Sequence, residues 1–339
     1  MSPAHPENWP VLTLQGAVDE QLLRDVTTLV AAAEESDGNP PLSEQTLVTL
    51  RARDAGPHTV LALALYAPDY SGDAADAGSR ARHRAAGPGP ARGNDLAGFA
   101  VVVGEADGTG VLEVAVHPSY RNQGVADRLV GELQRVRGFA GLKAWSHGNH
   151  EAAADLAARY GYAPVRELWK MRLATAASEL PDIALPDGVS LRGFVPGQDE
   201  EAWLAVNRAA FAHHPEQGNM NRADLDARMA EPWFDPAGFL LAVDAAGRIL
   251  GFHWTKVHPR HGEHPSIGEV YVVGVAPEAQ GTGLGKALTV AGIKHLQQQG
   301  LHAVMLYVDA DNIPAVALYR RLGFSRWDVD VMYAPLEGR

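Results

Sequence analysis

The two halves of the sequence carry the same motif, and the same second motif follows it at nearly the same distance. The first half contains V-A-V-H-P-S-Y-R-N-Q-G-V-A, ending at Ala126, and the second contains V-G-V-A-P-E-A-Q-G-T-G-L-G, ending at Gly285. Downstream, R-Y-G-Y at 159–162 matches R-L-G-F at 321–324, with 43 and 46 residues separating the motif proline from the glycine. Order and spacing that repeat in this way predict two copies of one domain.

A third pair of matching residues lies upstream. Glu44-Gln45 precedes the first motif proline by 74 residues, and Glu216-Gln217 precedes the second by 61. Residues 68–95 account for the difference, because they are rich in Gly, Ala, Asp and Arg without apolar periodicity, which indicates a loop inserted between two strands. The stretch 174–188 holds two prolines and favours a linker. We therefore expect an N-terminal domain at 1–175, a linker at 176–188 and a C-terminal domain at 189–339.

Composition narrows the possible functions. The chain of 339 residues has no cysteine, which excludes disulfides, thiolate metal sites, Fe–S clusters and a cysteine nucleophile. Its formal net charge of −12 disfavours nucleic acid and anionic membranes as partners. The N-terminus lacks a basic start followed by an apolar core, and no apolar run reaches about 18 residues. We expect a cytoplasmic, monomeric protein.

Helical and strand patterns mix in both halves. Apolar residues recur at helical spacing at 21–33, from 43, and at 125–137, 151–160, 199–212, 284–298 and 313–322. Strand patterns occupy 59–66, 96–103, 111–116, 143–146, 165–173, 239–244, 249–257, 267–275, 302–308 and 325–334. Hairpin-like neighbours in each half predict α/β domains with a mixed sheet rather than a purely parallel one.

Each copy of the repeat holds a strand, a proline, a short loop with the pattern (Q/R)-x-x-G-x-(G/A), and a helix. Glycines let backbone N–H groups turn inward, and the loop opens onto the positive end of a helix dipole, which suits a pyrophosphate. No G-K-[ST] closes the loop as in a P-loop, and the G-x-G-x-x-G dinucleotide pattern is absent. A plain strand-to-helix turn is the alternative, but the pattern occurs twice in the same context.

This loop resembles the acyl-CoA loop of the GCN5-related N-acetyltransferase (GNAT) superfamily. The second copy also has the family's later pattern, Asn312 followed by A-V-A-L-Y-R-R-L-G-F at 315–324. The resemblance implies an α/β fold of two tandem GNAT domains, each a mixed, mostly antiparallel sheet flanked by helices. It also implies acetyl-CoA as co-substrate and Tyr319 as the general acid that protonates the CoA thiolate.

The two copies differ in the groups that amine acetylation requires. A base must take the ammonium proton, and the strand before the CoA loop commonly carries it in GNAT enzymes. In the second copy this strand holds Glu269, eight residues before Pro277. The first copy has Gly110 at the aligned position and Ala157 where the second has Tyr319. Glu113 lies three residues along the strand, which predicts the opposite face. We therefore expect catalysis in the C-terminal domain, and CoA binding or a supporting role in the N-terminal one.

Longer strings in the second half give a closer resemblance. F-A-H-H-P-E-Q-G at 211–218, G-F-H-W-T-K-V-H-P at 251–259 and G-E-V-Y-V-V-G-V-A-P at 268–277 are similar to the tandem acetyltransferases of mycothiol biosynthesis. Enzymes of that group acetylate the cysteinyl amine of cysteinyl-glucosaminyl-inositol, the last step of the pathway. The resemblance implies a small-molecule amine substrate that contacts Glu44, Glu216, Lys256, Glu269 and Tyr307.

The same resemblance implies two acetyl-CoA sites. The site in the second copy comprises Val273, Gly274, Val275, Gln280, Gly281, Thr282, Gly283, Leu284, Gly285, Lys286, Asn312, Ile313, Pro314, Ala315, Val316 and Ala317. The site in the first copy comprises Val114, Ala115, Val116, Asn122, Gln123, Gly124, Val125, Ala126 and Asp127.

Two other functions remain open from the sequence. The chain could be a tandem GNAT enzyme for another amine, such as an aminoglycoside or a protein N-terminus, or a CoA-binding module without activity. A pure binder needs neither Glu269 nor Tyr319, so their presence favours an enzyme. The histidines at 253, 258, 261 and 264 lack a helical H-x-x-x-H register and a carboxylate pattern, so we expect no metal site.

Overall fold

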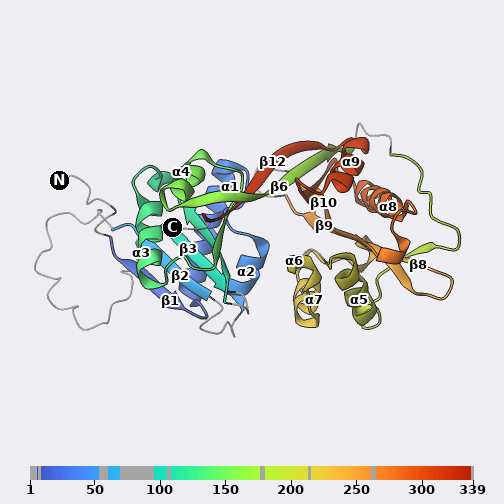
Figure 1. The fold of residues 1–339 in the computed structure, drawn as a ribbon, viewed down its shortest axis with the longest axis horizontal. Helices are drawn as coiled ribbons and strands as arrows, with labels where there is room; N and C mark the ends of the chain where they lie inside the picture. Colours follow the sequence, from blue (N-terminus) through green and yellow to red (C-terminus); the bar gives the residue numbers. More distant parts are fainter. Residues whose placement is uncertain are drawn as a thin grey trace, which may run out of the picture. The chain divides into compact units, whose positions relative to one another are not determined.

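The chain folds into two compact units (Figure 1). Unit 1 comprises Met1–Glu167 and Val329–Arg339, and unit 2 comprises Leu168–Asp328. This computed structural model describes residue 6 and residues 9–52, 60–68, 95–104, 108–175, 180–212, 215–260 and 265–336, without the side chains of residues 215 and 216. Most of the insertion expected at 68–95 therefore lies outside the described residues. None of the described helices is long and apolar enough to cross a membrane.

Unit 1 is a sheet with helices on both faces. Its elements are β1 (Val11–Gln15), α1 (Glu20–Asp37), α2 (Glu44–Arg51), β2 (Val60–Tyr66), β3 (Leu96–Gly104), β4 (Gly110–Val116), η3 (Pro118–Tyr120), α3 (Val125–Val136), β5 (Leu142–Ser146) and α4 (Glu151–Arg159). Strands β1 to β4 pair antiparallel in sequence order, and β5 pairs parallel to β4. Because side chains alternate along a strand, one face packs against α1 and α2 and the other against α3.

Unit 2 repeats this plan. Its elements are β7 (Ser190–Gly193), α5 (Glu200–Ala210), α6 (Pro215–Gly218), α7 (Arg222–Met229), η5 (Pro236–Gly238), β8 (Phe239–Val243), β9 (Ile249–His258), β10 (Ile267–Val275), η6 (Pro277–Ala279), α8 (Leu284–Gln298), β11 (Ala303–Asp309) and α9 (Ile313–Arg321). Strands β7 to β10 are antiparallel neighbours, and β11 is parallel to β10. Helices α5 and α7 pack on one face, and α8 and α9 on the other.

Each unit completes its sheet with a strand from the other half of the sequence. Strand β6 (Tyr162–Ala174) enters unit 2 and pairs antiparallel with β11, from Ala174 opposite Ala303 to Leu168 opposite Asp309. Strand β12 (Ser325–Pro335) returns to unit 1, where Val331–Tyr333 pair with β5. Neither half of the sequence therefore holds all the strands of its own sheet. The division at 1–175 and 189–339 stays a prediction, and the compact units divide the chain at different residues.

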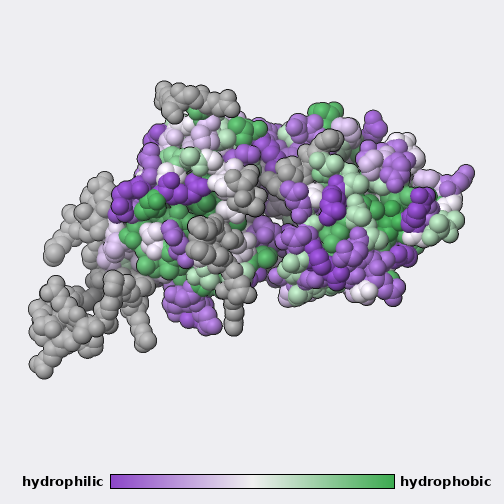
Figure 2. Space-filling view, turned by 60° about the horizontal axis from the view of Figure 1, so that its bottom comes forward, coloured by the Kyte–Doolittle hydropathy of each residue, from purple (hydrophilic) through white to green (hydrophobic). Residues whose placement is uncertain are grey.

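The α/β architecture expected from the patterns is confirmed. Every strand and helix predicted above is present, with ends that differ by a few residues. Two strands and two α-helices were not predicted: β1, β7, α6 and α7. The first two are short edge strands, and α7 has little apolar periodicity, because only Leu225 is buried in it. On the face of the molecule shown in Figure 2, hydrophilic side chains are interspersed with hydrophobic ones in both units.

Candidate functional site

The two parallel strands of each unit separate halfway along their length. Strand β10 pairs with β11 from Gly268 to Val270, and β4 pairs with β5 from Gly110 to Leu112. Beyond these residues the described strands of each parallel pair form no further ladder. One backbone edge at Val273–Val275, and likewise at Val114–Val116, is therefore open to a ligand. These are the strand segments that the sequence assigns to acetyl-CoA.

The loops after these two strands have the same backbone conformation. Gly124 and Gly283 each cap a helix with a positive φ, +85° and +87°. Asn122 has a φ of 60° where Gly281 has 76°. Asparagine is one of the few residues that tolerate this left-handed region, so the first loop keeps the turn without the glycine. Neither α3 nor α8 has a side-chain N-cap, so their first N–H groups are available for a phosphate.

The side chain before each turn reaches back to the preceding strand. Gln280 Nε2 donates to the carbonyl oxygen of Val275 at 3.2 Å, and Arg121 Nε donates to that of Val116 at 3.4 Å. The Arg121 guanidinium also makes two 2.7 Å hydrogen bonds to Asp37. Burial raises the pKa of Asp37, but the hydrogen bond and charge of Arg121 outweigh it and lower the pKa overall. Asp37 therefore compensates the charge of Arg121.

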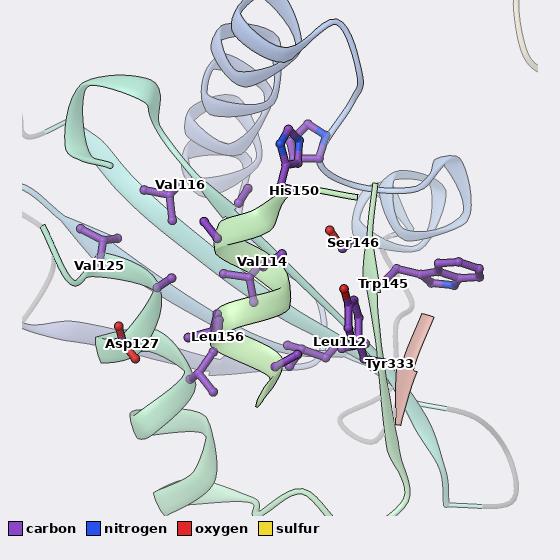
Figure 3. Close-up of a pocket in the computed structure, with 18 of the residues that line it drawn as sticks. Leu112, Val114, Val116, Val125, Asp127, Trp145, Ser146, His150, Leu156 and Tyr333 are labelled. Carbon is purple, nitrogen blue, oxygen red and sulfur yellow. The ribbon is translucent and has the colours of Figure 1, made fainter. Parts of the chain in front are cut away.

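A cavity of about 360 Å³ opens beside the first loop in unit 1 (Figure 3). Its walls come from the open part of β4, the start of α3, helix α4 and Tyr333 of the returning strand β12. Eight of the nine residues assigned to the first acetyl-CoA site line it, and the ninth, Gln123, bonds instead to the carbonyl oxygen of Ser119. Ala157, the counterpart of Tyr319, also lies in the wall. A volume of this size is typical of small-molecule sites.

The first helical turns at the two loops carry opposite charges. Asp127 lies in the first turn of α3, and Arg159 Nη1 binds its carboxylate at 2.8 Å. Lys286 occupies the equivalent place in α8, whose first turn has no acidic residue. Positive charge at this place favours a phosphate and negative charge opposes it. The second loop is therefore the better pyrophosphate site.

Glu269 lies in a buried, positively charged part of unit 2. Its side chain is 8 % exposed, and its Oε2 accepts a hydrogen bond from His258 Nε2 at 2.6 Å. Burial raises the pKa of the Glu269 carboxyl, but the hydrogen bond to His258 and the charges of His258, Lys256 and Lys170 outweigh it and lower the pKa. Glu269 is thus a carboxylate, the state in which it can accept a proton.

A β-bulge in β10 changes which residue of unit 1 corresponds to Glu269. The register of β10 against β9 shifts between Val270 and Val272, whereas β4 pairs with β3 without a shift. Counting back from the loops, Glu269 therefore corresponds to Val111, not to Gly110 as the sequence alignment suggests. Glu113 is two residues from Val111 and lies on the same face of its strand, so the prediction of the opposite face was wrong.

Tyr319 lies on the buried side of α9 and packs in one cluster with Val273, Ala315 and Val316. Its ring contacts Phe324 at a centroid distance of 5.7 Å, and burial raises its pKa to about 12. A phenol with this pKa keeps its proton at neutral pH, which is the state that a proton donor needs, and it is a weaker acid than an exposed tyrosine. Tyr319 also contributes to the hydrophobic core, so it combines packing with the chemistry expected of an acid.

The residues assigned to the substrate lie in both units. Lys256 is directly opposite Glu269 in the β9–β10 register, and its Nζ lies 4.6 Å from the ring centre of Trp233 and 5.2 Å from that of Tyr271. Tyr307 on β11 pairs with Lys170, whose Nζ is 5.7 Å from the tyrosine ring centre. Glu44 begins α2 of unit 1, directly after the N-cap Ser43. Glu216 belongs to α6, but its side chain is outside the described residues.

The other residues that the sequence assigns to the second acetyl-CoA site lie at the end of β10, in the loop before α8 and in the first turns of α8 and α9. Asn312 is the N-cap of α9, and its Oδ1 accepts from the N–H of Ala315 at 3.3 Å. Gly274 is packed so closely that a Cβ would lie 2.7 Å from the Phe252 ring, which explains the glycine there. Residues 280–286 form the loop and the first turn of α8.

The two described histidines of the 253–264 stretch lie in different environments. His253 is fully buried, its Nδ1 donates to the Leu288 carbonyl oxygen at 2.8 Å, and burial lowers its pKa to about 4. His258 binds Glu269 instead, and His261 and His264 are outside the described residues.

Sequence reasoning missed two contributors to the site, Lys170 and the pairing of His258 with Glu269. Lys170 comes from β6, which enters unit 2 from the first half of the sequence, and a repeat comparison gives no sign of that exchange. The pairing of His258 could have been found, because Lys256 and His258 alternate along one face of a strand that forms a hairpin with the strand of Glu269.

Comparison with known proteins agrees with this geometry. Residues 203–324 match the model of the acetyltransferase (GNAT) family, and residues 91–164 match that of the acetyltransferase (GNAT) domain. A mycothiol acetyltransferase of an Arthrobacter sp. is 75% identical over 338 residues, which is 100% of both chains. Another, of Pseudarthrobacter chlorophenolicus, is 74% identical over 99% of both.

Solved structures share the fold at lower identity. A tandem GNAT protein from the clavulanic acid biosynthesis pathway superimposes with a TM-score of 0.67 at 20% identity, covering 97% of this chain and 99% of the other. This similarity shows the tandem fold, and the close sequence relatives show the group. The chain belongs to the GNAT acetyltransferases and, within them, to the mycothiol acetyltransferases.

Proposed function

We propose that the chain transfers the acetyl group of acetyl-CoA to the cysteinyl amine of cysteinyl-glucosaminyl-inositol, as a monomeric cytoplasmic enzyme. The observation that carries the proposal is the ionised, buried Glu269 on β10, four residues before the strand edge left open at Val273–Val275. A base next to an open strand edge is the arrangement that an amine and a thioester require to meet. The relatives named mycothiol acetyltransferase support this choice of amine.

The chain's own residues supply each proton and charge that the reaction needs. Glu269 takes one proton from the substrate ammonium, and the freed electron pair of nitrogen attacks the thioester carbonyl. A backbone N–H of Val273–Val275 donates to the developing oxyanion. The C–S bond then breaks, and Tyr319 gives its proton to the CoA sulfur. The nitrogen loses its second proton to solvent as the amide forms. The products are the acetamide and CoA, Glu269 releases its proton to solvent, and Tyr319 regains one, so that one proton is released overall.

We propose that the cavity of unit 1 binds acetyl-CoA without transferring the acetyl group. Its loop repeats the turn of the second loop, which supports binding. At the places of the base and the acid it has Val111 and Ala157, and neither side chain can exchange a proton. Calorimetric titration of the whole chain with CoA is expected to give two sites, of which the weaker is strengthened in Asp127→Lys. A single site that Asp127→Lys leaves unchanged would contradict this second binding role.

Substrate identity is tested by competition. The purified chain is given acetyl-CoA with equal amounts of cysteinyl-glucosaminyl-inositol, an aminoglycoside and a peptide with a free N-terminus, and the acetylated products are measured by mass. We expect the cysteinyl substrate to be acetylated in large excess. Preferential acetylation of another amine would keep the acetyltransferase chemistry and overturn this substrate. No acetylation with CoA bound would leave a binding module.

A further inference from the structure

His258 is the hydrogen-bond partner of the proposed base, and the proposed reaction gives it no task yet. Its Nε2 lies 2.6 Å from Glu269 Oε2, and its own side chain is 34% exposed. The pair is diagonal across the β9–β10 hairpin, because Lys256 is directly opposite Glu269 and His258 lies two residues further along the same face. A carboxylate only accepts, so the imidazole nitrogen donates.

The two lysines near Glu269 are held by aromatic rings. The Lys256 ammonium lies over Trp233 and Tyr271, and the Lys170 ammonium lies over Trp327 at 4.7 Å and Tyr307 at 5.7 Å. Both ammonium groups act on Glu269 through their charge. Among the described residues, the hydrogen bond to the Glu269 carboxylate comes from His258, and it reaches only one of the two oxygens.

We propose that His258 is the positioning residue of Glu269: its Nε2–H fixes Oε2 and leaves Oε1 to take the proton of the substrate amine. The inference rests on the proposed function, in which Glu269 is the base. The ammonium N–H bond breaks, its proton bonds to Oε1, and the electron pair stays on the amine nitrogen. His258 keeps its Nε2–H throughout this step. Without it, the Glu269 carboxylate is free to turn toward the charge of Lys256 or Lys170.

The charge of His258 matters as well as its position. Among the described residues, the other charged groups that act on Glu269 are Lys256, on the same strand as His258, and Lys170 on β6. A protonated imidazole adds a third positive charge beside the two lysines. It therefore opposes the entry of an ammonium and weakens Glu269 as a base.

Two variants separate position from charge. Glutamine at position 258 can still donate an amide N–H to Oε2 but carries no charge, whereas alanine has no group that can donate. We expect His258→Ala to lower kcat about 100-fold while the KM for acetyl-CoA stays unchanged, the cost of a misplaced base. We expect His258→Gln to keep kcat within about threefold of the wild type at its optimum, because the hydrogen bond is retained. His302→Gln, at an exposed histidine of unit 2, is the matched control and should change nothing.

The proposal is overturned if His258→Ala keeps the kcat of the wild type, or if His258→Gln loses as much activity as His258→Ala. A spectroscopic measurement needs no turnover and so separates this proposal from the proposed function. The charge-assisted Nε2–H of His258 should give a downfield proton resonance that disappears in Glu269→Ala and persists in His302→Gln. A resonance that survives Glu269→Ala would refute the pairing even if the enzyme is active. If the resonance disappears in Glu269→Ala as expected but the wild type does not acetylate the substrate, the pairing stands and the proposed substrate is refuted.

Discussion

The imidazole Nε2 of His147 lies 2.8 Å from the carboxylate of Glu113, in a part of unit 1 where Glu113 is buried and the His147 side chain is 13% exposed. On its other side, His147 Nδ1 lies 3.0 Å from Asp330, a residue of the returning strand β12. Glu113 also accepts from the backbone N–H of Ser43 at 3.1 and 3.2 Å. The imidazole therefore connects β4, β12 and the N-terminus of α2, the helix that begins with Glu44.

The His147 network predicts a pH-dependent stability. Burial lowers the pKa of His147, but the hydrogen bonds and charges of Asp330 and Glu113 outweigh it and raise the pKa to about 10. The folded state thus holds this proton more tightly than the unfolded chain, where a histidine pKa is about 6.5. The stabilisation is complete below about pH 6.5 and is lost as the pH rises through about 10.

Replacing His147 tests this account. His147→Gln should lower the free energy of unfolding by about 3–5 kcal/mol at pH 6.5, because it leaves two buried carboxylates without their cation. Urea unfolding of both proteins should show the difference shrinking toward pH 10. His150→Gln, at a half-exposed histidine 3.9 Å from Asp37, is the control and should cost less than about 0.5 kcal/mol. A difference for His147→Gln that is the same at pH 6.5 and pH 10 would argue against a protonated His147.

Two glycines at the start of α8 should respond differently to replacement by alanine. Gly283 has a φ of +87°, where an added Cβ costs about 1–2 kcal/mol, although space for it is open. Gly285 lacks a positive φ, a Cβ there would meet Val275 at 3.6 Å, and the first loop has Ala126 at this place. Gly283→Ala should therefore weaken acetyl-CoA binding by about tenfold, and Gly285→Ala should bind nearly as the wild type. Calorimetry with CoA measures both, and equal losses would contradict a conformational role for Gly283.

Replacing either of the two proposed proton carriers of unit 2 should reduce turnover with little loss of substrate binding. Glu269→Gln removes the proposed base, and Tyr319→Phe removes the proposed acid while keeping the ring in the core. Each should lower kcat by about 10²–10⁴-fold, the usual contribution of general acid–base catalysis. Tyr319→Phe should leave the melting temperature nearly unchanged, because the aromatic packing with Phe324 remains. Wild-type kcat in both variants would show that neither group moves a proton in the slow step.

The exchange of strands predicts that the halves of the chain depend on each other. A fragment of residues 189–339 lacks β6 and leaves the edge of β11 from Ala303 to Asp309 unpaired, which is an aggregation hazard. A fragment of residues 1–175 likewise lacks the β12 partner of β5. Each fragment alone should be unstable or aggregate, and co-expression should recover soluble protein. Two fragments that fold separately, with sharp cooperative unfolding, would favour the domain boundaries inferred from the sequence.

Much of the fold could be predicted because the chain repeats itself. Two matching loops fixed the domain type, and the apolar periods located the central strands and the long helices. The exchange of β6 and β12 could not be predicted, since each strand has an ordinary apolar pattern that suits either unit. The bulge in β10 was also hidden, because one extra residue at Tyr271 changes no hydrophobic pattern and still moves the aligned partner of Glu269 from Gly110 to Val111.

The residues of the candidate site that belong to a sequence motif could be predicted. The residues that are brought together only by packing of distant strands could not be predicted. The loop residues 122–127 and 280–286 could be read from glycine spacing, and the structure gives both loops the same turn. The environment of Glu269 comes from three separate strands, so the cations that keep it ionised were not visible in the sequence. The same holds for Asp37, which lies 84 residues before Arg121 and compensates its charge.

The most direct test of the account is the mass of the product formed from acetyl-CoA and cysteinyl-glucosaminyl-inositol. The account predicts the gain of one acetyl group on the cysteine nitrogen, one free CoA for each product molecule, and loss of both in Glu269→Gln. An unchanged substrate mass, with CoA bound to the folded chain, would contradict it.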